Sequence, residues 1–210
     1  MSRTPLVSGN WKMHLNHLEA IQLVQRISYE LSNHDYDKVE VSLHPPFTDI
    51  RSIQTLVDAD RMKFKVGAQN VHAETKGAFT GEVAPGMLAK LNVSYVIVGH
   101  SERRQLFDET NEIVNAKAKA ILKNEMTPIV CCGETLEQRE AGEAESFVES
   151  QIRGSLAGLS AEQVASMVVA YEPIWAIGTG VTASTEDAQA MCAHVRGVVE
   201  AMKKGTGGSV

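Results

Sequence analysis

The sequence predicts an α/β protein with a parallel β-sheet, formed by a single domain that spans residues 1–210. Short apolar runs begin at positions 6, 39, 65, 95, 127 and 167, so consecutive runs start 26 to 40 residues apart. That spacing is about the length of one strand followed by one crossover helix. Helical patterns lie between the runs, and strands that alternate with helices require a parallel sheet.

The expected strands are residues 6–8, 39–43, 65–68, 95–98, 127–131 and 167–171. Their unbroken, β-branched apolar character is typical of strands that are buried on both faces. Three of the helices show a clear apolar stripe at helical spacing. The stripes consist of Leu18, Ile21, Val24, Ile27 and Leu31; of Val114, Ala118, Ile121 and Leu122; and of Ala188, Met191, Val195, Val198 and Met202.

Two closures of such a sheet compete, a doubly wound open sheet and a (β/α)₈ barrel. The turn after the first strand reads Gly9-Asn10-Trp11-Lys12-Met13, which lacks the Gly-x-Gly-x-x-Gly pattern of a dinucleotide-binding unit. This favours the barrel weakly. A barrel typically takes about 250 residues, whereas this sequence supplies about six βα units and a Gly-rich stretch at 205–210, either the end of a seventh unit or a flexible tail.

Composition excludes several classes of protein. The formal net charge of −6 and the pI near 5.7 argue against nucleic acid or an anionic membrane as the main partner. An anionic small substrate would need local positive potential from a few lysines or helix N-termini. Cys131, Cys132 and Cys192 indicate neither a disulfide framework nor a zinc site, and a reducing cytoplasm fits best. The scattered histidines predict no metal site, and no signal peptide or membrane span is expected.

A glutamate at the end of the sixth apolar run is the strongest candidate for chemistry. Glu172 should emerge where a buried strand ends, and partial desolvation of its carboxylate would suit it to proton abstraction. A candidate lid follows, stiffened at one end by its proline and freed at the other by its glycines. It comprises Pro173, Ile174, Trp175, Ala176, Ile177, Gly178, Thr179 and Gly180. The alternative is that Glu172 simply caps the next helix.

Polar residues also follow two other expected strands. Asn10 and Lys12 follow the first and His100 follows the fourth, and active sites of α/β barrels are assembled from such strand ends. Taken singly, Asn10 is compatible with a turn former, Lys12 with a surface charge and His100 with a helix cap. Ser101 and Glu102 read as the start of a helix, whose dipole would disfavour an imidazolium at His100.

Taken together, the flanking sequences resemble the triosephosphate isomerase family, in its order and near its spacing, from about Thr4 to about Lys203. The matching motifs are Gly9 to Met13, Gly99-His100-Ser101-Glu102-Arg103-Arg104, Ala170 to Gly180, Pro128-Ile129-Val130-Cys131 with Gly133-Glu134, and Gly67-Ala68-Gln69-Asn70. The resemblance implies a TIM (β/α)₈-type barrel. It also implies a glycolytic and gluconeogenic isomerase that interconverts dihydroxyacetone phosphate and D-glyceraldehyde 3-phosphate without cofactor or metal.

The resemblance assigns the roles as well. Glu172 is implied as the base that moves a proton between C1 and C2, His100 as a neutral imidazole that polarises the carbonyl, and Lys12, with Asn10, as the group facing the enediolate. It implies phosphate binding by Gly178 and by the turn Gly207-Gly208-Ser209. Arg103 and Arg104 are expected to be structural or interface charges.

The resemblance is incomplete near the end of the sequence, where the body of a seventh strand and the eighth unit have no counterpart. We therefore expect the first and sixth strands to have unpaired edges, and the activity to be much reduced. The alternative interpretation is a noncatalytic barrel fragment that self-associates. The loop 69–82, from Gln69 to Glu82, is long and carries the apolar Phe79. By resemblance it inserts beside Lys12 of a second copy and forms a homodimer.

Overall fold

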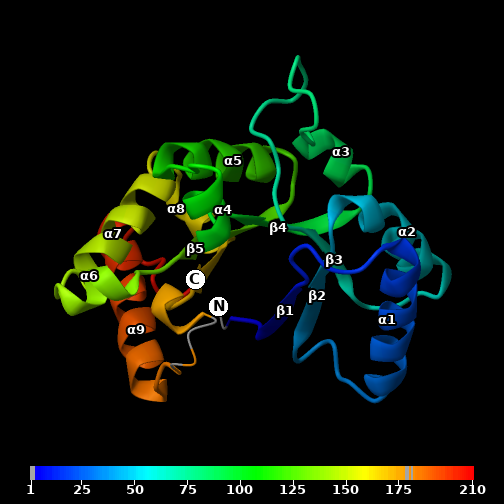
Figure 1. Ribbon diagram of the computed structural model, residues 1–210, viewed down its shortest axis with the longest axis horizontal. Helices are drawn as coiled ribbons and strands as arrows, with labels where there is room; N and C mark the ends of the chain where they lie inside the picture. The colour runs from blue at the N-terminus through cyan, green and yellow to red at the C-terminus, as the bar shows by residue number, and fades with distance from the viewer. Residues whose placement is uncertain (1–2, 178–179, 181) are drawn as a thin grey trace.

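The computed structural model describes residues 3–177, 180 and 182–210. It contains one sheet of six parallel strands, each paired with the next along the chain. The sheet is curled, and the helices lie along its outer side, so the structure is a partial (β/α) barrel (Figure 1). The strands are β1 (Leu6–Asn10), β2 (Glu40–His44), β3 (Lys65–Ala68), β4 (Val93–Val98), β5 (Thr127–Cys132) and β6 (Val168–Tyr171).

Helices follow every strand, as the spacing predicted. The three stripes fall on α1 (His17–Glu30), α5 (Asn111–Lys123) and α9 (Thr185–Met202). The other helical segments are α2 (Phe47–Ala59), α3 (Pro85–Ala89), α4 (Ser101–Leu106), α6 (Leu136–Glu140), α7 (Ala144–Ser155), α8 (Ala161–Ala165) and a 3₁₀ turn, η1 (Ile174–Ala176). Most of the long helices begin at a side-chain cap, for example Asn16 before α1, whose oxygen accepts from Leu18 N and Glu19 N.

Both faces of the central strands are apolar. On β4, Val96 and Val98 belong to the large core between sheet and helices, whereas Ile97 faces a smaller cluster with Ile129 and Cys131. Successive side chains of a strand point to opposite faces. The smaller cluster therefore lies on the inner side of the curl, which explains why these strands read as unbroken apolar runs.

The two edges of the sheet are open. Among the described residues, β1 pairs only with β2 and β6 pairs only with β5, as expected from the sequence. A cavity of about 610 Å³ lies between them and is lined from both edges, by Leu6 of β1 and by Val168 and Tyr171 of β6. The unpaired side of β1 also leaves Val7 60% exposed.

The residues after α9 form turns, and no seventh strand is found in this part of the described chain. The Glu200 carboxylate accepts hydrogen bonds from Gly205 N at 2.7 Å and Gly207 N at 3.0 Å, which folds the tail back onto α9. Arg3 Nη1 donates to Val210 O at 3.1 Å. The tail therefore lies close to the amino end of β1.

The loop 69–82 projects from the body of the protein between β3 and α3 (Figure 1). His72 N donates to Val83 O at 2.9 Å and closes the base of the loop. Phe79 is 44% exposed and packs only partly, with its ring centroid 4.2 Å from that of His72.

Candidate active site

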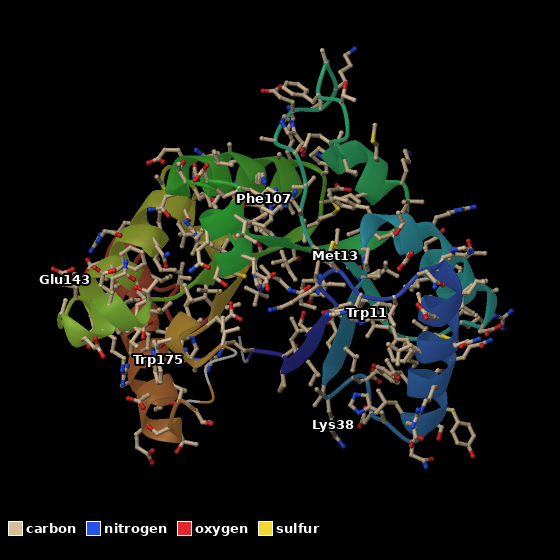
Figure 2. All side chains as sticks on the ribbon, viewed as in Figure 1. Trp11, Met13, Lys38, Phe107, Glu143 and Trp175 are labelled. Carbon is tan, nitrogen blue, oxygen red and sulfur yellow. The ribbon has the colours of Figure 1, made fainter. Side chains whose placement is uncertain are left out.

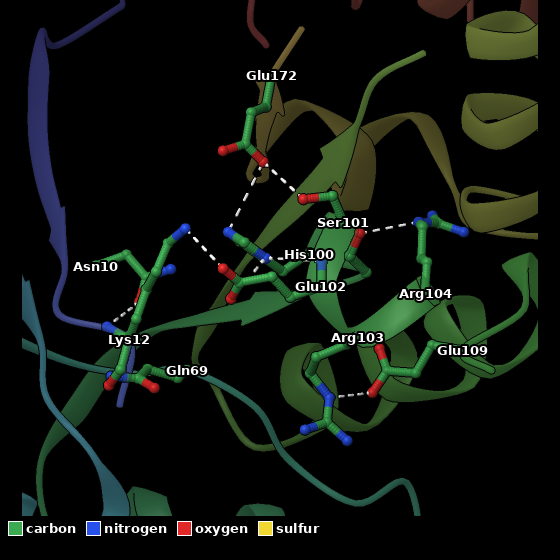
Figure 3. A network of polar contacts seen from close by, with 11 residues as sticks. Asn10, Lys12, Gln69, His100, Ser101, Glu102, Arg103, Arg104, Glu109 and Glu172 are labelled. Carbon is green, nitrogen blue, oxygen red and sulfur yellow. Dashed lines mark hydrogen bonds and ion pairs between the residues drawn. The ribbon is translucent and has the colours of Figure 1, made fainter. Parts of the chain in front are cut away.

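The candidate residues gather at one end of the sheet. Asn10 is the last residue of β1, His100 follows β4 after Gly99, and Glu172 follows β6 directly. Because all six strands are parallel, their carboxyl ends meet along one rim. Figure 3 shows the side chains of Asn10, Lys12, His100 and Glu172 directed toward one another there.

His100 is both the cap of a helix and a member of this group. Its Nδ1 accepts a hydrogen bond from Glu102 N at 3.2 Å, at the first turn of α4. A nitrogen that accepts from a backbone N–H carries no proton, so the ring is the neutral tautomer with its proton on Nε2. That nitrogen lies 3.7 Å from Glu172 Oε2, and the His100 side chain is 11% exposed. The capping and the catalytic interpretations of His100 are therefore compatible.

Glu172 is held at the rim by two neighbours. Ser101 Oγ donates to Glu172 Oε2 at 3.1 Å, and Glu172 N donates to Cys132 O at 2.9 Å. A Cβ at Gly133 would lie 1.8 Å from Glu172 O, so only glycine allows this close approach of the two segments. The Glu172 side chain remains one-third exposed. It does not cap a helix, because Pro173 precedes η1.

Lys12 adopts a left-handed backbone, with φ of 53°. Its N–H donates to Asn10 Oδ1 at 3.0 Å, and its Nζ lies 2.7 Å from Glu102 Oε1. The other Glu102 oxygen lies 3.6 Å from His100 Nδ1. With the proton of the ring on Nε2, this second distance is not a hydrogen bond, so the Glu102 carboxylate holds the Lys12 ammonium and the Glu102 backbone N–H holds the imidazole.

Ser101 and Glu102 were not predicted as site residues. The sequence shows them only as the start of α4, and their partners Glu172 and Lys12 lie 71 and 90 positions away. The two arginines of the same motif turn away from the site, as predicted. Arg103 pairs with Glu109, and Arg104 Nε donates to Gly99 O at 2.8 Å.

The first half of the candidate lid is anchored to a buried glutamate. Trp175 Nε1 and Tyr171 OH donate to Glu134 Oε1 at 2.7 and 3.0 Å, and Glu134 is fully buried. Trp175, labelled in Figure 2, is buried. Burial, with the nearby Glu134 carboxylate, raises the pKa of Tyr171. Gly178 and Thr179 lie outside the described residues.

Ser209 is not brought to this group. Ser209 N donates to Thr206 O at 2.9 Å, and its neighbours Gly208 and Val210 line the cavity beside Leu6 and Val168. Those residues lie at the amino ends of β1 and β6, whereas Asn10 and Glu172 lie at the carboxyl ends. In this conformation Glu200 and Arg3 hold the tail at the other end of the sheet, so phosphate binding by Ser209 stays a prediction that would require the tail to move.

Two kinds of site are absent from the residues that the structure describes. No group of three or more His, Cys, Asp and Glu side chains in them is arranged to hold a metal ion. None of the helices in this part of the chain is both long and apolar enough to cross a membrane.

Comparison with known proteins identifies the family of the chain. The family model for triosephosphate isomerase matches residues 5–210. The chain is 59% identical over 196 residues to the triosephosphate isomerase of Rhodococcus jostii and 58% identical to that of Mycobacteroides abscessus, covering 93% of this chain and 75% of each relative. It is 57% identical to the enzyme of Streptomyces coelicolor, covering 76% of it. The chain therefore belongs to the triosephosphate isomerase family, a family of isomerases.

Proposed function

We propose that the rim of the sheet carries out the reaction of this family, the interconversion of dihydroxyacetone phosphate and D-glyceraldehyde 3-phosphate in glycolysis and gluconeogenesis. The observation that supports this most is the convergence of Glu172, His100 and Lys12 from three different strand ends, with His100 Nε2 3.7 Å from Glu172 Oε2. The alternative, a noncatalytic barrel fragment that self-associates, has no finding in its favour.

Each group has a distinct task in the proposed mechanism. Removal of a proton from carbon beside a carbonyl requires a base and a way to stabilise charge on the oxygen. Glu172 takes the proton from one carbon and returns it to its neighbour. The Nε2–H of His100 donates to the carbonyl oxygen, and the Lys12 ammonium, with the Asn10 amide, faces the developing enediolate. A neutral histidine in this role is known for the family and is carried over from it here.

Glu172 is held by Ser101 in the conformation described, so it must exchange this bond for contact with the substrate. Because Glu172 directly precedes residues 173–180, we propose that closure of this lid moves the carboxylate and brings Gly178 N–H to the phosphate. Exclusion of water then protects the enediolate phosphate from elimination.

Turnover of a triose phosphate in a coupled assay tests the role of Glu172. Glu172→Gln removes the base and keeps the shape, so kcat is expected to fall by about 10²- to 10⁴-fold. Glu172→Asp keeps the carboxylate but shortens its reach, so its kcat should lie between that of the unmodified protein and that of Glu172→Gln. Glu143→Gln is the matched control, because Glu143 is exposed and caps no helix with its side chain. Unchanged turnover in Glu172→Gln would remove Glu172 from the mechanism.

We also propose a homodimer formed through the loop 69–82. The loop projects from the molecule (Figure 1), and Phe79 on it is 44% exposed. Met13, next to Lys12 and labelled in Figure 2, is also largely exposed. Burial of these two side chains against a second copy would remove apolar surface from water. Sedimentation at micromolar concentration should show a dimer that Phe79→Asp converts to monomer, whereas Tyr29→Asp, at another exposed aromatic, leaves it intact.

The proposed location is the cytoplasm. Its support is that Cys131, Cys132 and Cys192 are all free thiols, a state that a reducing compartment maintains. Cell fractionation that recovered the protein outside the cytoplasm would contradict it.

A further inference from the structure

The backbone of Lys12 is strained. Its φ of 53° lies in the left-handed region, which is disfavoured for a residue with a Cβ. Such a conformation persists only where neighbouring groups hold it in place. The direction of the Lys12 side chain, and therefore the position of its ammonium, depends on this turn.

Two side chains hold the turn, one on each side of Lys12 (Figure 3). Asn10 Oδ1 accepts from Lys12 N at 3.0 Å. Gln69 Nε2 donates to Lys12 O at 2.7 Å and to His44 O at 2.9 Å. A primary amide has two N–H protons, and Gln69 has one for each of the two carbonyl oxygens.

The two carbonyl groups depend on Gln69 to different degrees. His44 O also accepts from Trp11 N at 3.1 Å. Among the described residues, Gln69 is the only donor to Lys12 O. Loss of the Gln69 amide therefore leaves His44 O with a partner but releases Lys12 O, so its main effect falls on the Lys12 turn and not on the contact between β2 and β3.

We propose that Gln69 is a positioning residue for the isomerisation and acts through Lys12. The inference rests on the proposed function, in which the Lys12 ammonium faces the enediolate. Asn10 and Gln69 fix the N–H and the carbonyl group of Lys12, and this sets the direction in which the Lys12 side chain leaves the turn. The ammonium at its end then lies 2.7 Å from Glu102 Oε1. Without Gln69, Lys12 relaxes toward an ordinary backbone conformation and its Nζ is no longer held beside His100.

The experiment compares three single variants with the unmodified protein. Gln69→Met keeps the length of the side chain and removes both donors, and Gln69→Glu replaces the donors with oxygens that repel both carbonyls. Gln163→Met is the matched control, because Gln163 caps the distant helix α8 through Ser160. We expect kcat/KM to fall by about tenfold to a hundredfold in both Gln69 variants and to stay unchanged in the control. Sedimentation confirms that all proteins share one oligomeric state, since Gln69 begins the loop 69–82.

A double-mutant cycle with Lys12→Met separates positioning from general stability. The readout is the affinity for 2-phosphoglycolate, an anionic analogue of the enediolate phosphate, which needs no turnover. Gln69→Met should weaken binding in the presence of Lys12 and have no further effect in the Lys12→Met protein. An equal loss in both backgrounds, or wild-type kcat/KM in Gln69→Met, would overturn the proposal.

Hydrogen exchange of the Lys12 amide provides a test that does not depend on activity. The amide should exchange faster in Gln69→Met than in the unmodified protein and the Gln163→Met control. Unchanged exchange would show that Gln69 does not hold the turn. Absence of isomerase activity in the unmodified protein would instead refute the proposed function, while the exchange result would still decide the role of Gln69 at Lys12.

Discussion

A buried histidine should make the protein sensitive to mild acid. His44, the last residue of β2, is fully buried on the sheet. Its Nδ1 donates to Ala68 O at 3.1 Å, so its Nε2 accepts from the Ser8 hydroxyl at 2.9 Å. Ser42 Oγ lies 3.0 Å from the same nitrogen and donates its own proton to Ser8 Oγ at 3.0 Å. Gly67 leaves room for the ring, since a Cβ there would lie 2.3 Å from it. Burial lowers the pKa of His44 from 6.5 to about 4.

The sign and size of the effect follow from this difference in pKa. Between pH 6.5 and 4 the unfolded chain binds a proton at His44 that the folded protein does not bind, so the stability declines as the pH falls through this range. The shift of the pKa from 6.5 to about 4 corresponds to about 3 kcal/mol in full. Between pH 7 and pH 5, about 2 kcal/mol of this stabilisation should be lost.

Urea unfolding at pH 7, 6 and 5 measures this loss. His44→Gln is the comparison, because glutamine hydrogen-bonds but does not titrate, and the other histidines are present in both proteins. The unmodified protein should lose about 2 kcal/mol more than His44→Gln between pH 7 and pH 5. Parallel curves for the two proteins would show that His44 does not carry the acid sensitivity.

Four further substitutions test three other features. Lys117→Met removes one of the two cations paired with the buried Glu109 carboxylate, and Arg103 remains, so the free energy of unfolding in urea should fall by about 1–3 kcal/mol. Lys38→Met, at an exposed ion pair, should cost no more than about 1 kcal/mol. Gly133→Ala places a Cβ 1.8 Å from Glu172 O and should lower both turnover and the thermal midpoint; wild-type values would contradict this close approach. Gly197→Ala, in α9 with open space around it, should stabilise the protein by about 0.5–1 kcal/mol, and a destabilised variant would contradict it.

Much of the fold could be predicted from the sequence because its strands are buried on both faces. Such strands read as continuous apolar runs, and the start of every observed strand lies within two residues of the predicted one. The last residues of the strands were predicted less well. Strand β1 continues to Asn10, beyond its last apolar residue, because Asn10 still pairs with His44. Pairing of this kind depends on the neighbouring strand and leaves no mark in the local pattern.

The site was predicted in part, and the site residues that the sequence did not reveal were missed for one common reason. Asn10, Lys12, His100 and Glu172 follow strand ends and could be found by their type and position. The residues that orient them act over long separations in sequence: Gln69 is 57 positions from Lys12, and Glu102 is 90. Neither has a local signal beyond its place in a motif.

The sequence by itself determined the order of strands and helices, the parallel sheet and the chemical groups available at its rim, because these depend on local composition and spacing. Only the tertiary structure decided which of the groups meet, which tautomer His100 adopts and that the turn containing Ser209 folds away. Which groups meet depends on contacts between distant segments, such as Ser101 Oγ against Glu172 and Lys12 Nζ against Glu102. The tautomer of His100 and the path of the tail depend on the exact geometry of shorter-range hydrogen bonds, from the Glu102 amide to His100 and from the Gly207 amide to Glu200. Hydrogen bonds require atoms placed within a few tenths of an ångström, and only the packed chain sets distances of that accuracy.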